Sequence, residues 1–458
     1  MPLRFKPRQL TLCLSLGLLI EASRGFAQED FGGYRHEFYR EDDHRMSVDT
    51  DTVGFDIGLG SNVRLAGQLV QDAISGATPT GAPPQKQWPF PTFNDFYNQA
   101  HTQLFQAAVN DPNNLILYQS GYFATFQDYT NYIAASYPEI AGQATNNAAA
   151  SYQALTNSPG FHNTKVPLTK LHDLRRALSI SAPIAFGIHQ ITPQFSFSDE
   201  SDYVSYGAAL NYAVELNKKN TTLNLGWSHN FDSVRDDVRV WERKDTDDFL
   251  LGVKQLLTPK SYLIANFTYG QEYGYLSDPY RGVMQIVPGN FAYEQQNPLD
   301  ASLIPERRPR FRTKQIFYAS YDQFIDPLDG SVELGYRFFH DSYNIFAHTA
   351  EIAWHQKIGG NLVFTPAFRY YYQTAASFYS TYILTPDPSV LPAYYSADYR
   401  LSRLQTFNLS ATLSYRVCKY FSLDLGYSRY IMQGLDGVTS QSAYPSANVY
   451  TIGGRIWF

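Results

Sequence analysis

Residues Val449–Phe458 read Val-Tyr-Thr-Ile-Gly-Gly-Arg-Ile-Trp-Phe, and this stretch decides the fold class. One face of the strand that it predicts carries Tyr450, Ile452, Gly454, Ile456 and Phe458. The opposite face carries Thr451, Gly453, Arg455 and Trp457. A period of two with one apolar face is typical of a strand that meets lipid on one side and a polar interior on the other. The last strand of a soluble β-protein would alternate in the same way, so the rest of the chain has to decide.

The same alternation runs backwards along the chain. Phe407, Leu409 and Leu413 alternate with small polar residues, and the stretches 204–214 and 223–227 show the same pattern. The interleaved residues are those expected inside a water-filled barrel, because a sandwich would instead have a surface face rich in Lys and Glu. The sequence therefore predicts an all-β, transmembrane antiparallel β-barrel.

About sixteen strands are predicted from this pattern. They lie near residues 33–40, 46–58, 61–73, 168–181, 184–197, 204–216, 221–230, 246–257, 261–275, 312–325, 331–340, 346–357, 362–374, 403–416, 419–432 and 449–458. An even number with both ends on one side is the rule for single-chain bacterial barrels, and counts of about fourteen and eighteen stay open. The long connections 231–245, 276–310, 375–402 and 433–448 alternate with tight turns, as in outer-membrane barrels.

The stretch 76–165 is a long insertion between two of these strands. Helix-like segments are predicted near 93–109, 124–136 and 138–156. A loop of this length without structure of its own would be unusual in a compact domain. We expect an extracellular loop that forms an ordered cap over the barrel mouth or a plug inside the lumen; the alternative is a poorly ordered surface insertion.

The amino terminus predicts a cleavable secretory signal peptide at residues 1–27. A basic region precedes the apolar run Leu10–Ile20, and Gly25 and Ala27 are small residues of the kind that a signal peptidase reads. The mature chain, residues 28–458, would then contain Cys418 as its single cysteine and no internal disulfide. The mild formal charge of −6 gives no indication of a nucleic-acid partner.

Four segments carry a resemblance to a known family: Asp72–Pro79, Tyr275–Arg281, Arg307–Arg312 and Tyr395–Ser402. They look like segments of a family of bacterial outer-membrane proteins that is known as a domain of unknown function with a predicted barrel. The terminal Phe458, with the apolar face described above, also resembles the signal by which such barrels are recognised for insertion. The resemblance implies a place in the cell outer membrane, contact with its lipid and lipopolysaccharide, and insertion by the barrel-assembly machinery. It implies no substrate and no catalytic residue.

Charged residues on the predicted interior faces are the candidate selectivity residues. They are Asp56, Arg64, Arg175, His189, Glu215, Lys254, Glu333, Arg337, Glu351, Arg369, Asp424 and Arg455. Opposed acidic and basic arcs could set a transverse field that orients polar solutes, or they could form ion pairs that fill a closed lumen.

A second charged group predicts a basic ladder near the outer mouth. Its members are Arg307, Arg308, Arg310, Arg312 and Lys314. Such a ladder could attract anions or bind lipopolysaccharide phosphates, and the plainer interpretation is a solvated strand end balanced by acids.

No sequence motif points to catalysis. The chain has no Gly-x-Ser-x-Gly elbow, no His-Glu-x-x-His and no phosphate loop, so no catalytic, metal-binding or cofactor-binding residue is predicted. A barrel of about sixteen strands leaves an aqueous channel unless something fills it. The expected function is porin-like passive passage of small polar solutes, narrowed by the 76–165 loop. The main alternative is a non-conducting barrel that docks a partner or a surface glycan through its extracellular loops.

Overall fold

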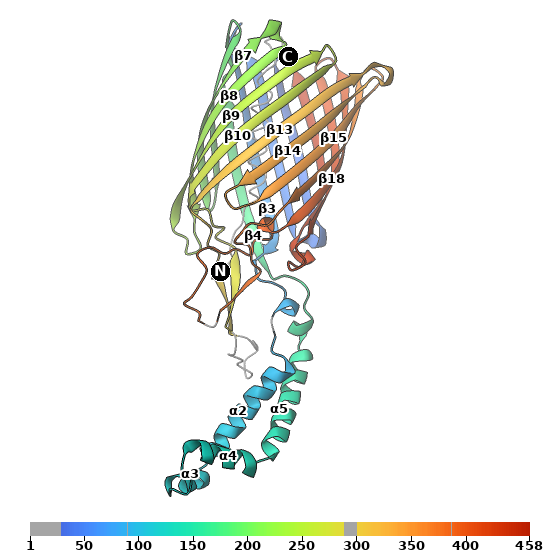
Figure 1. The fold of residues 1–458 in the computed structure, drawn as a ribbon. Coiled ribbons are helices and arrows are strands. Elements are labelled where there is room, and N and C mark those ends of the chain that lie inside the picture. Colours follow the sequence, from blue (N-terminus) through green and yellow to red (C-terminus); the bar gives the residue numbers. More distant parts are fainter. Residues whose placement is uncertain (1–28, 89, 288–299, 386) are drawn as a thin grey trace.

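Sixteen antiparallel strands close into a barrel in the computed structural model, which describes residues 29–88, 90–287, 300–385 and 387–458 (Figure 1). The strands of the wall are β1 (Phe31–Glu41), β2 (Met46–Gly58), β3 (Arg64–Pro79), β4 (Leu168–Ser181), β6 (His189–Glu200), β7 (Tyr203–Leu216), β8 (Thr221–Arg235), β9 (Trp241–Thr258), β10 (Ser261–Gly274), β13 (Phe311–Ile325), β14 (Gly330–Asp341), β15 (Phe346–Ile358), β16 (Leu362–Gln373), β18 (Leu404–Cys418), β19 (Phe421–Gly434) and β20 (Ser446–Trp457). β1 pairs with β20 as well as with β2, which closes the barrel. The predicted fold class is confirmed.

Alternating side chains explain why these segments form a wall. On β14 and β15, Leu334 and Ile352 are 45% and 47% exposed on the outer face. Glu333 and Glu351 precede them directly and therefore point to the inner face. The wall thus has an apolar outside and a polar inside, and its closed ladder leaves no edge strand against lipid.

One predicted strand is divided in the structure. The segment predicted at 184–197 is a short strand, β5 (Ile184–Phe186), followed by a turn and then by β6. Gly187 lies in this turn with φ = +64°, a backbone conformation that a residue without Cβ adopts at no steric cost. Because β5 continues the line of β4 and pairs back onto β6, the number of strands in the wall stays at sixteen.

The two rims of the barrel differ in the length of their connections. The turn rim has the connections 59–63, 187–188, 217–220, 259–260, 326–329, 359–361 and 419–420. The loop rim has the connections 42–45, 80–167, 201–202, 236–240, 275–310, 342–345, 374–403 and 435–445. Both ends of the described chain lie at the turn rim, where the Phe458 N–H donates to the Asp30 carbonyl at 3.0 Å. Every long connection therefore leaves from one rim.

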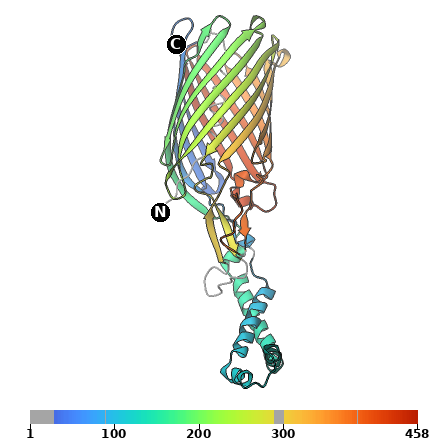
Figure 2. The same ribbon diagram turned by 60° about the vertical axis from the view of Figure 1, so that its left-hand side comes forward.

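The insertion between β3 and β4 forms a helical arm. Its helices are α2 (Phe93–Val109), α3 (Pro112–Gln119), α4 (Phe126–Ser136) and α5 (Glu139–Thr156). In both views the arm projects away from the loop rim instead of entering the barrel (Figures 1 and 2). The predicted helical segments are present as α2, α4 and α5, whereas α3 was not predicted. The four helices neither cover nor enter the barrel, in contrast to the expected cap or plug. The arm buries apolar residues in cores of its own, with Phe96 against Ala148 and Tyr129 against Ile133, so it does not depend on the barrel for a core.

Smaller elements lie at the loop rim and in the turns. A three-stranded sheet contains β11 (Gly282–Val287), β12 (Asp300–Pro305) and β17 (Tyr382–Leu384). Single 3-10 turns are formed by Asp42–His44, Gln85–Gln87, Pro159–His162, Asn217–Lys219, Asp326–Leu328, Tyr399–Leu401 and Gln441–Ala443. No helix in the described part of the chain is long and apolar enough to cross a membrane. The predicted signal peptide lies outside the described residues.

Candidate functional site at the loop rim

The connection 275–310 crosses the barrel mouth. It leaves the wall at β10, yet Tyr280 packs against Leu171 of β4 and Ile74 of β3, which are five and six strands away along the wall. The Gly282 N–H donates to the Thr80 carbonyl at 2.9 Å, which ties the connection to the far side. A chain segment bound to both sides of the mouth is placed to close it.

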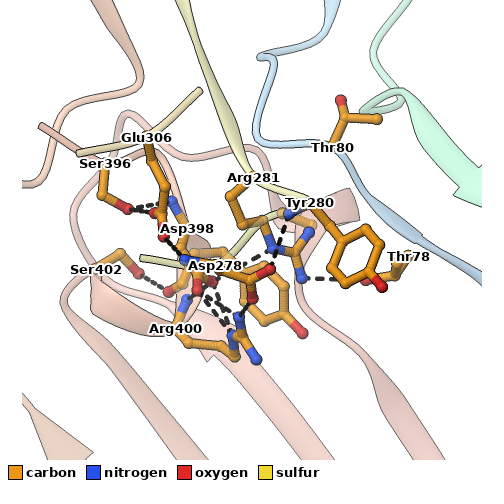
Figure 3. Close-up of polar contacts among 12 residues, drawn as sticks. Thr78, Thr80, Asp278, Tyr280, Arg281, Glu306, Ser396, Asp398, Arg400 and Ser402 are labelled. Atoms are coloured by element: carbon orange, nitrogen blue, oxygen red, sulfur yellow. Dashed lines mark hydrogen bonds and ion pairs between the residues drawn. The ribbon is translucent and has the colours of Figure 1, made fainter. Parts of the chain in front are cut away.

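A cluster of six charged residues holds this connection to the connection 374–403, and we name it the clasp (Figure 3). Its members are Asp278, Arg281, Glu306, Arg308, Asp398 and Arg400. Arg308 bridges two carboxylates, with Nε 2.7 Å from Glu306 Oε1 and Nη2 2.8 Å from Asp398 Oδ2. Arg400 Nε lies 2.9 Å from both carboxylate oxygens of Asp398, and its Nη2 also contacts Asp278.

Arg281 extends the clasp to the wall. Its Nε lies 3.8 Å from Asp398 Oδ1, and its Nη2 donates to Thr78 Oγ1 at 3.1 Å. The guanidinium carbon lies 5.4 Å from the ring centre of Tyr399, a distance at which the ring face attracts a cation. One arginine therefore connects both crossing connections to the end of β3.

Burial and charge balance set the electrostatics of the clasp. Asp398 is 1% exposed, and the three acids are matched by three arginines. Burial alone would raise the pKa of the Asp398 carboxyl, but the guanidiniums of Arg400 and Arg281 outweigh it and hold that pKa well below its usual range. Burial raises the pKa of Glu306, a rise that Arg308 opposes. Asp398 is thus the anion on which the clasp depends, because all three arginines contact it.

Aromatic residues from two connections pack against the loop-rim ends of the wall. Tyr399 and Tyr444 pack in one apolar cluster with Leu404 and Met432, which lie on β18 and β19. The Ser402 and Tyr444 hydroxyls lie 2.6 Å apart in a hydrogen bond. The base of the 76–165 insertion takes part in this packing at the loop rim, since Ala82 lies in one apolar cluster with Met284 and Ile286 of the connection 275–310. Narrowing of a channel by that loop stays a prediction.

The structure places the predicted selectivity residues on the inner wall with one exception. The inner-face residues are Asp56, Arg64, Arg175, Glu215, Lys254, Glu333, Arg337, Glu351, Arg369, Asp424 and Arg455, each of which alternates with outward neighbours. His189 instead shares the outer face with Tyr212, whose hydroxyl lies 2.7 Å from its Nδ1, because the turn at Gly187 sets the strand parity. The role of the others in selectivity stays a prediction.

The inner-wall charges differ in their access to water. The Arg369 and Glu351 side chains, paired at 3.0 Å, are 41% and 39% exposed. Nearer the loop rim, Arg175 and Asp72 pair at 3.3 Å and are buried. Access to water on the inner wall therefore differs between these two ion pairs.

The five residues of the predicted basic ladder do not form one ladder. Arg312 and Lys314 point inward on β13, and each contacts Glu272. Arg308 belongs to the clasp, and Arg310, which precedes β13, pairs with Glu242 at 2.8 Å where it is exposed to solvent at the rim. Arg307 contributes only its backbone to the pairing with Tyr395. The change of direction at the start of β13 separates residues that a straight strand would have aligned.

Three carboxylates near the loop rim could hold a cation. Asp173, Glu200 and Asp202 are buried, and one oxygen from each lies within 4.8 Å of the others. Asp173 also accepts hydrogen bonds from the Leu174 N–H at 2.9 Å and from Ser201 Oγ at 3.1 Å. An acidic cluster alone does not identify a metal, so this geometry assigns no ligand.

The clasp was not predicted from the sequence, and of its six residues only Arg308 was named as a candidate, in the basic ladder. Asp278, Arg281, Asp398 and Arg400 all lie in segments that carry the family resemblance. The similar runs Asp278-Pro-Tyr-Arg281 and Asp398-Tyr-Arg400 were a usable signal, since each supplies an acid and an arginine to the same cluster. The two runs lie more than a hundred residues apart in the chain, and a local sequence pattern does not predict contact over such a separation.

Comparisons with known proteins concern the family and the fold. The sequence profile of the family described as "Protein of unknown function (DUF3570)" matches residues 33–241 and 235–450. No curated protein matches the sequence. The structure is similar to the siderophore receptor PirA from Pseudomonas aeruginosa, with 8% sequence identity and a TM-score of 0.38 over 94% of this chain and 61% of that chain. It is also similar to CdiB from Acinetobacter baumannii, with 8% identity and a TM-score of 0.44 over 93% of this chain and 60% of that chain. A third similar structure is in-vitro folded OmpT, an outer membrane protein of Vibrio cholerae, with 9% identity and a TM-score of 0.39 over 94% of this chain and 97% of that chain. The chain thus spans less than two thirds of the length of PirA and of CdiB.

Proposed function

The chain belongs to the DUF3570 family of unknown function, and from that premise we propose that it is an outer-membrane channel for small polar solutes with a closable outer mouth. In this proposal the loop rim faces the outside of the cell and the turn rim faces the periplasm. The signal peptide and the barrel-assembly machinery would bring the chain to the membrane. Transport is passive, so no residue has a catalytic role and no cofactor is needed.

The contrast between the interior and the mouth carries the proposal. Charged inner-wall side chains such as Arg369 and Glu351 keep about two fifths of their surface exposed, whereas Asp398 in the clasp keeps almost none. A barrel of about eight strands is just wide enough for side chains to fill it, whereas sixteen strands leave an aqueous channel unless something fills it. A wet interior that ends in a buried ion-pair cluster fits a conduit whose entrance opens when the clasp separates.

Selection of solutes would take place along the inner wall. Arg369 faces Glu351 across a strand pair, and Glu333 lies 3.4 Å from His355. Such pairs place both signs of charge next to the water column, which favours polar solutes over apolar ones. The clasp would decide whether the mouth is open, and the wall would decide what passes.

Single-channel current in planar bilayers tests the proposal. The refolded mature chain should be closed most of the time, and D398N should raise the open time at least tenfold because the clasp loses its shared anion. A matched control is D326N, which changes an exposed carboxylate at the turn rim and should leave the current unchanged. Silence of both the parent chain and D398N, in a correctly folded barrel, would contradict the channel.

A second candidate function is binding of a neutral surface glycan by the helical arm. No Lys or Arg lies between Lys86 and Lys165, and Tyr122 is 74% exposed at the far end of the arm. The carboxylates of Asp95 and Asp128 are occupied in capping boxes at the starts of α2 and α4. Exposed tyrosines and amides without basic charge suit sugar hydroxyls and ring faces better than phosphates.

The glycan candidate has its own test on the full chain. Binding to immobilised neutral glycans should fall at least tenfold in the double variant Y122A/Y132A, because both side chains are exposed at the α3–α4 end. The control Y415A/Y420A removes two exposed tyrosines near the turn rim. Equal binding by all three proteins, or none by the parent chain, would contradict this candidate and leave the channel proposal intact.

A further inference from the structure

A row of cations faces outward on β4 beside the loop rim. Lys170, His172 and Arg176 are exposed, and so is Leu174 between them. The residues between, such as Asp173 and Arg175, are buried on the inner face, so the alternation that defines the wall also defines this row.

On its β6 side, the row extends beyond the end of the neighbouring strand toward the loop rim. β4 pairs with β3 along its whole length, but its pairing with β6 covers only Arg176–Ser181. The hairpin of β6 and β7 turns back at residues 201–202, below the level of Lys170. On the other side, β3 places the small residues Ser75 and Ala77 opposite His172 and Lys170. On the β3 side, Lys170 and His172 therefore have small residues as their cross-strand neighbours.

The cations of this row have no carboxylate partner within 4.0 Å among the residues that the structure describes. Two arginines at the same rim are paired, Arg40 with Asp49 at 2.5 Å and Arg429 with Asp42 at 2.6 Å. In the described part of the chain, exposed arginines without an ion pair at this rim, such as Arg239 in 236–240 and Arg403 in 374–403, stand in connections and not in a row on the wall. Asp199 lies opposite Arg176 in the strand register and reduces the field at that end without forming an ion pair. The row is thus a local surplus of positive charge on an apolar wall.

Apolar residues continue the same outer face toward the middle of the barrel. Ile180 on β4 and Phe195 on β6 are exposed and lie opposite each other. A cationic row above an apolar band is the arrangement that receives a lipid with an anionic headgroup, since phosphates meet the cations and acyl chains meet the band.

We propose that the β4 row binds the phosphorylated sugar headgroup of an outer-leaflet glycolipid, the lipid A type, and so anchors the barrel in that leaflet. Lys170 and Arg176 are six residues apart, about 20 Å along a strand, which exceeds the reach of one phosphate and suits a headgroup with two. Ser75 and Ala77 leave room for a sugar ring beside the row. The proposal rests on the outer-membrane location put forward under Proposed function, but not on conduction.

Lipid retention in nanodiscs tests this site on the refolded mature chain. Nanodiscs of phosphatidylcholine would contain a small fraction of diphosphoryl lipid A or, separately, of phosphatidylglycerol, and lipids that stay with the protein would be counted by native mass spectrometry. The row variant is K170Q/H172Q/R176Q. The control, K218Q/K357Q/K419Q, removes three exposed lysines at the turn rim. We expect the parent chain and the control to retain lipid A, and the row variant to retain at least tenfold less lipid A than the parent chain.

Each other outcome has a definite meaning. Equal retention of lipid A by the row variant would overturn the site. Equal retention of phosphatidylglycerol and lipid A would overturn the glycolipid assignment, and competition by free inorganic phosphate would show a simple anion site. A chain that does not insert, judged by the absence of a heat-dependent gel shift, would overturn the location and this site together. Lipid A retention without single-channel current would contradict the channel and leave this site standing.

Discussion

Arg281 donates a hydrogen bond to Thr78 across the barrel mouth, with 3.1 Å between Nη2 and Oγ1. The two residues are 203 positions apart in the chain, and they belong to a connection after β10 and to the end of β3. Because the same guanidinium also approaches Asp398, this contact joins the clasp to the wall. A few charged contacts thus hold the connections to the wall, and in the channel proposal this makes closure sensitive to single substitutions.

R281L is expected to loosen the mouth without unfolding the barrel. The leucine keeps most of the bulk but loses the contacts to Thr78 and Asp398, and Asp398 keeps Arg308 and Arg400. Protease cleavage in the connection 275–310, followed by mass spectrometry, should become faster, while the heat-dependent gel shift of the barrel stays the same. Cleavage at the parent rate would show that Arg281 does not hold the connection.

D398N should lower the stability of the clasp far more than E306Q does. Removing the shared anion leaves three arginines around a neutral amide, and breaking a buried ion pair costs about 3–5 kcal/mol. Glu306 already has a raised pKa because of its burial, so its neutral form is tolerated and E306Q should cost a small fraction of that. Chemical denaturation followed by a probe in the connection 374–403 measures both. An equal loss would contradict the central place of Asp398.

The clasp should stay closed from neutral pH down to about pH 4 and open below it. The folded-state pKa of Asp398 is lowered, so the stability that it contributes is present above its ordinary pKa and is lost as the pH falls through the folded value. The folded-state pKa of Glu306 is raised, so its protonation on mild acidification favours the folded state and does not open the mouth. Open time or protease sensitivity as a function of pH checks this. Opening between pH 7 and 5 would contradict it.

Neutralising either member of the inner-wall pair Arg369–Glu351 should shift the ion preference of the open channel, in opposite directions for the two residues. R369Q should shift the ion preference of the open channel toward cations, and E351Q should shift it toward anions, because each leaves its partner alone beside the water column. Reversal potentials in a salt gradient, recorded in a D398N background, measure the shift. Identical reversal potentials in the two variants would exclude this pair from selectivity.

Replacement of residues 93–157 by a short Gly/Ser linker should leave the barrel intact. The arm has its own cores and does not enter the barrel, so folding, the heat-dependent gel shift and conductance should match those of the parent chain. Loss of glycan binding without loss of current would separate the two candidate functions. A large rise in current would instead show that the arm restricts the mouth.

The sequence by itself determined the elements of this protein. Period-two alternation marks strands because successive side chains point to opposite faces, and it predicted all sixteen, including the last strand at Val449–Phe458. Three of the four helices of the arm followed from local patterns as well, and α2 has the predicted bounds 93–109, whereas α3 was not predicted. Such signals depend on neighbours a few positions apart, which is why they can be read without a structure.

Only the tertiary structure decided how the mouth is built. Asp278 and Arg400 are 122 positions apart, and their contact depends on two connections that cross the mouth of a closed barrel. The direction of the arm and the division of the residues from Arg307 to Lys314 among the clasp, the inner wall and the exterior depend on the same geometry. A charged side chain pairs with the opposite charge that closure of the barrel brings near it. The order of residues in the chain does not specify that partner.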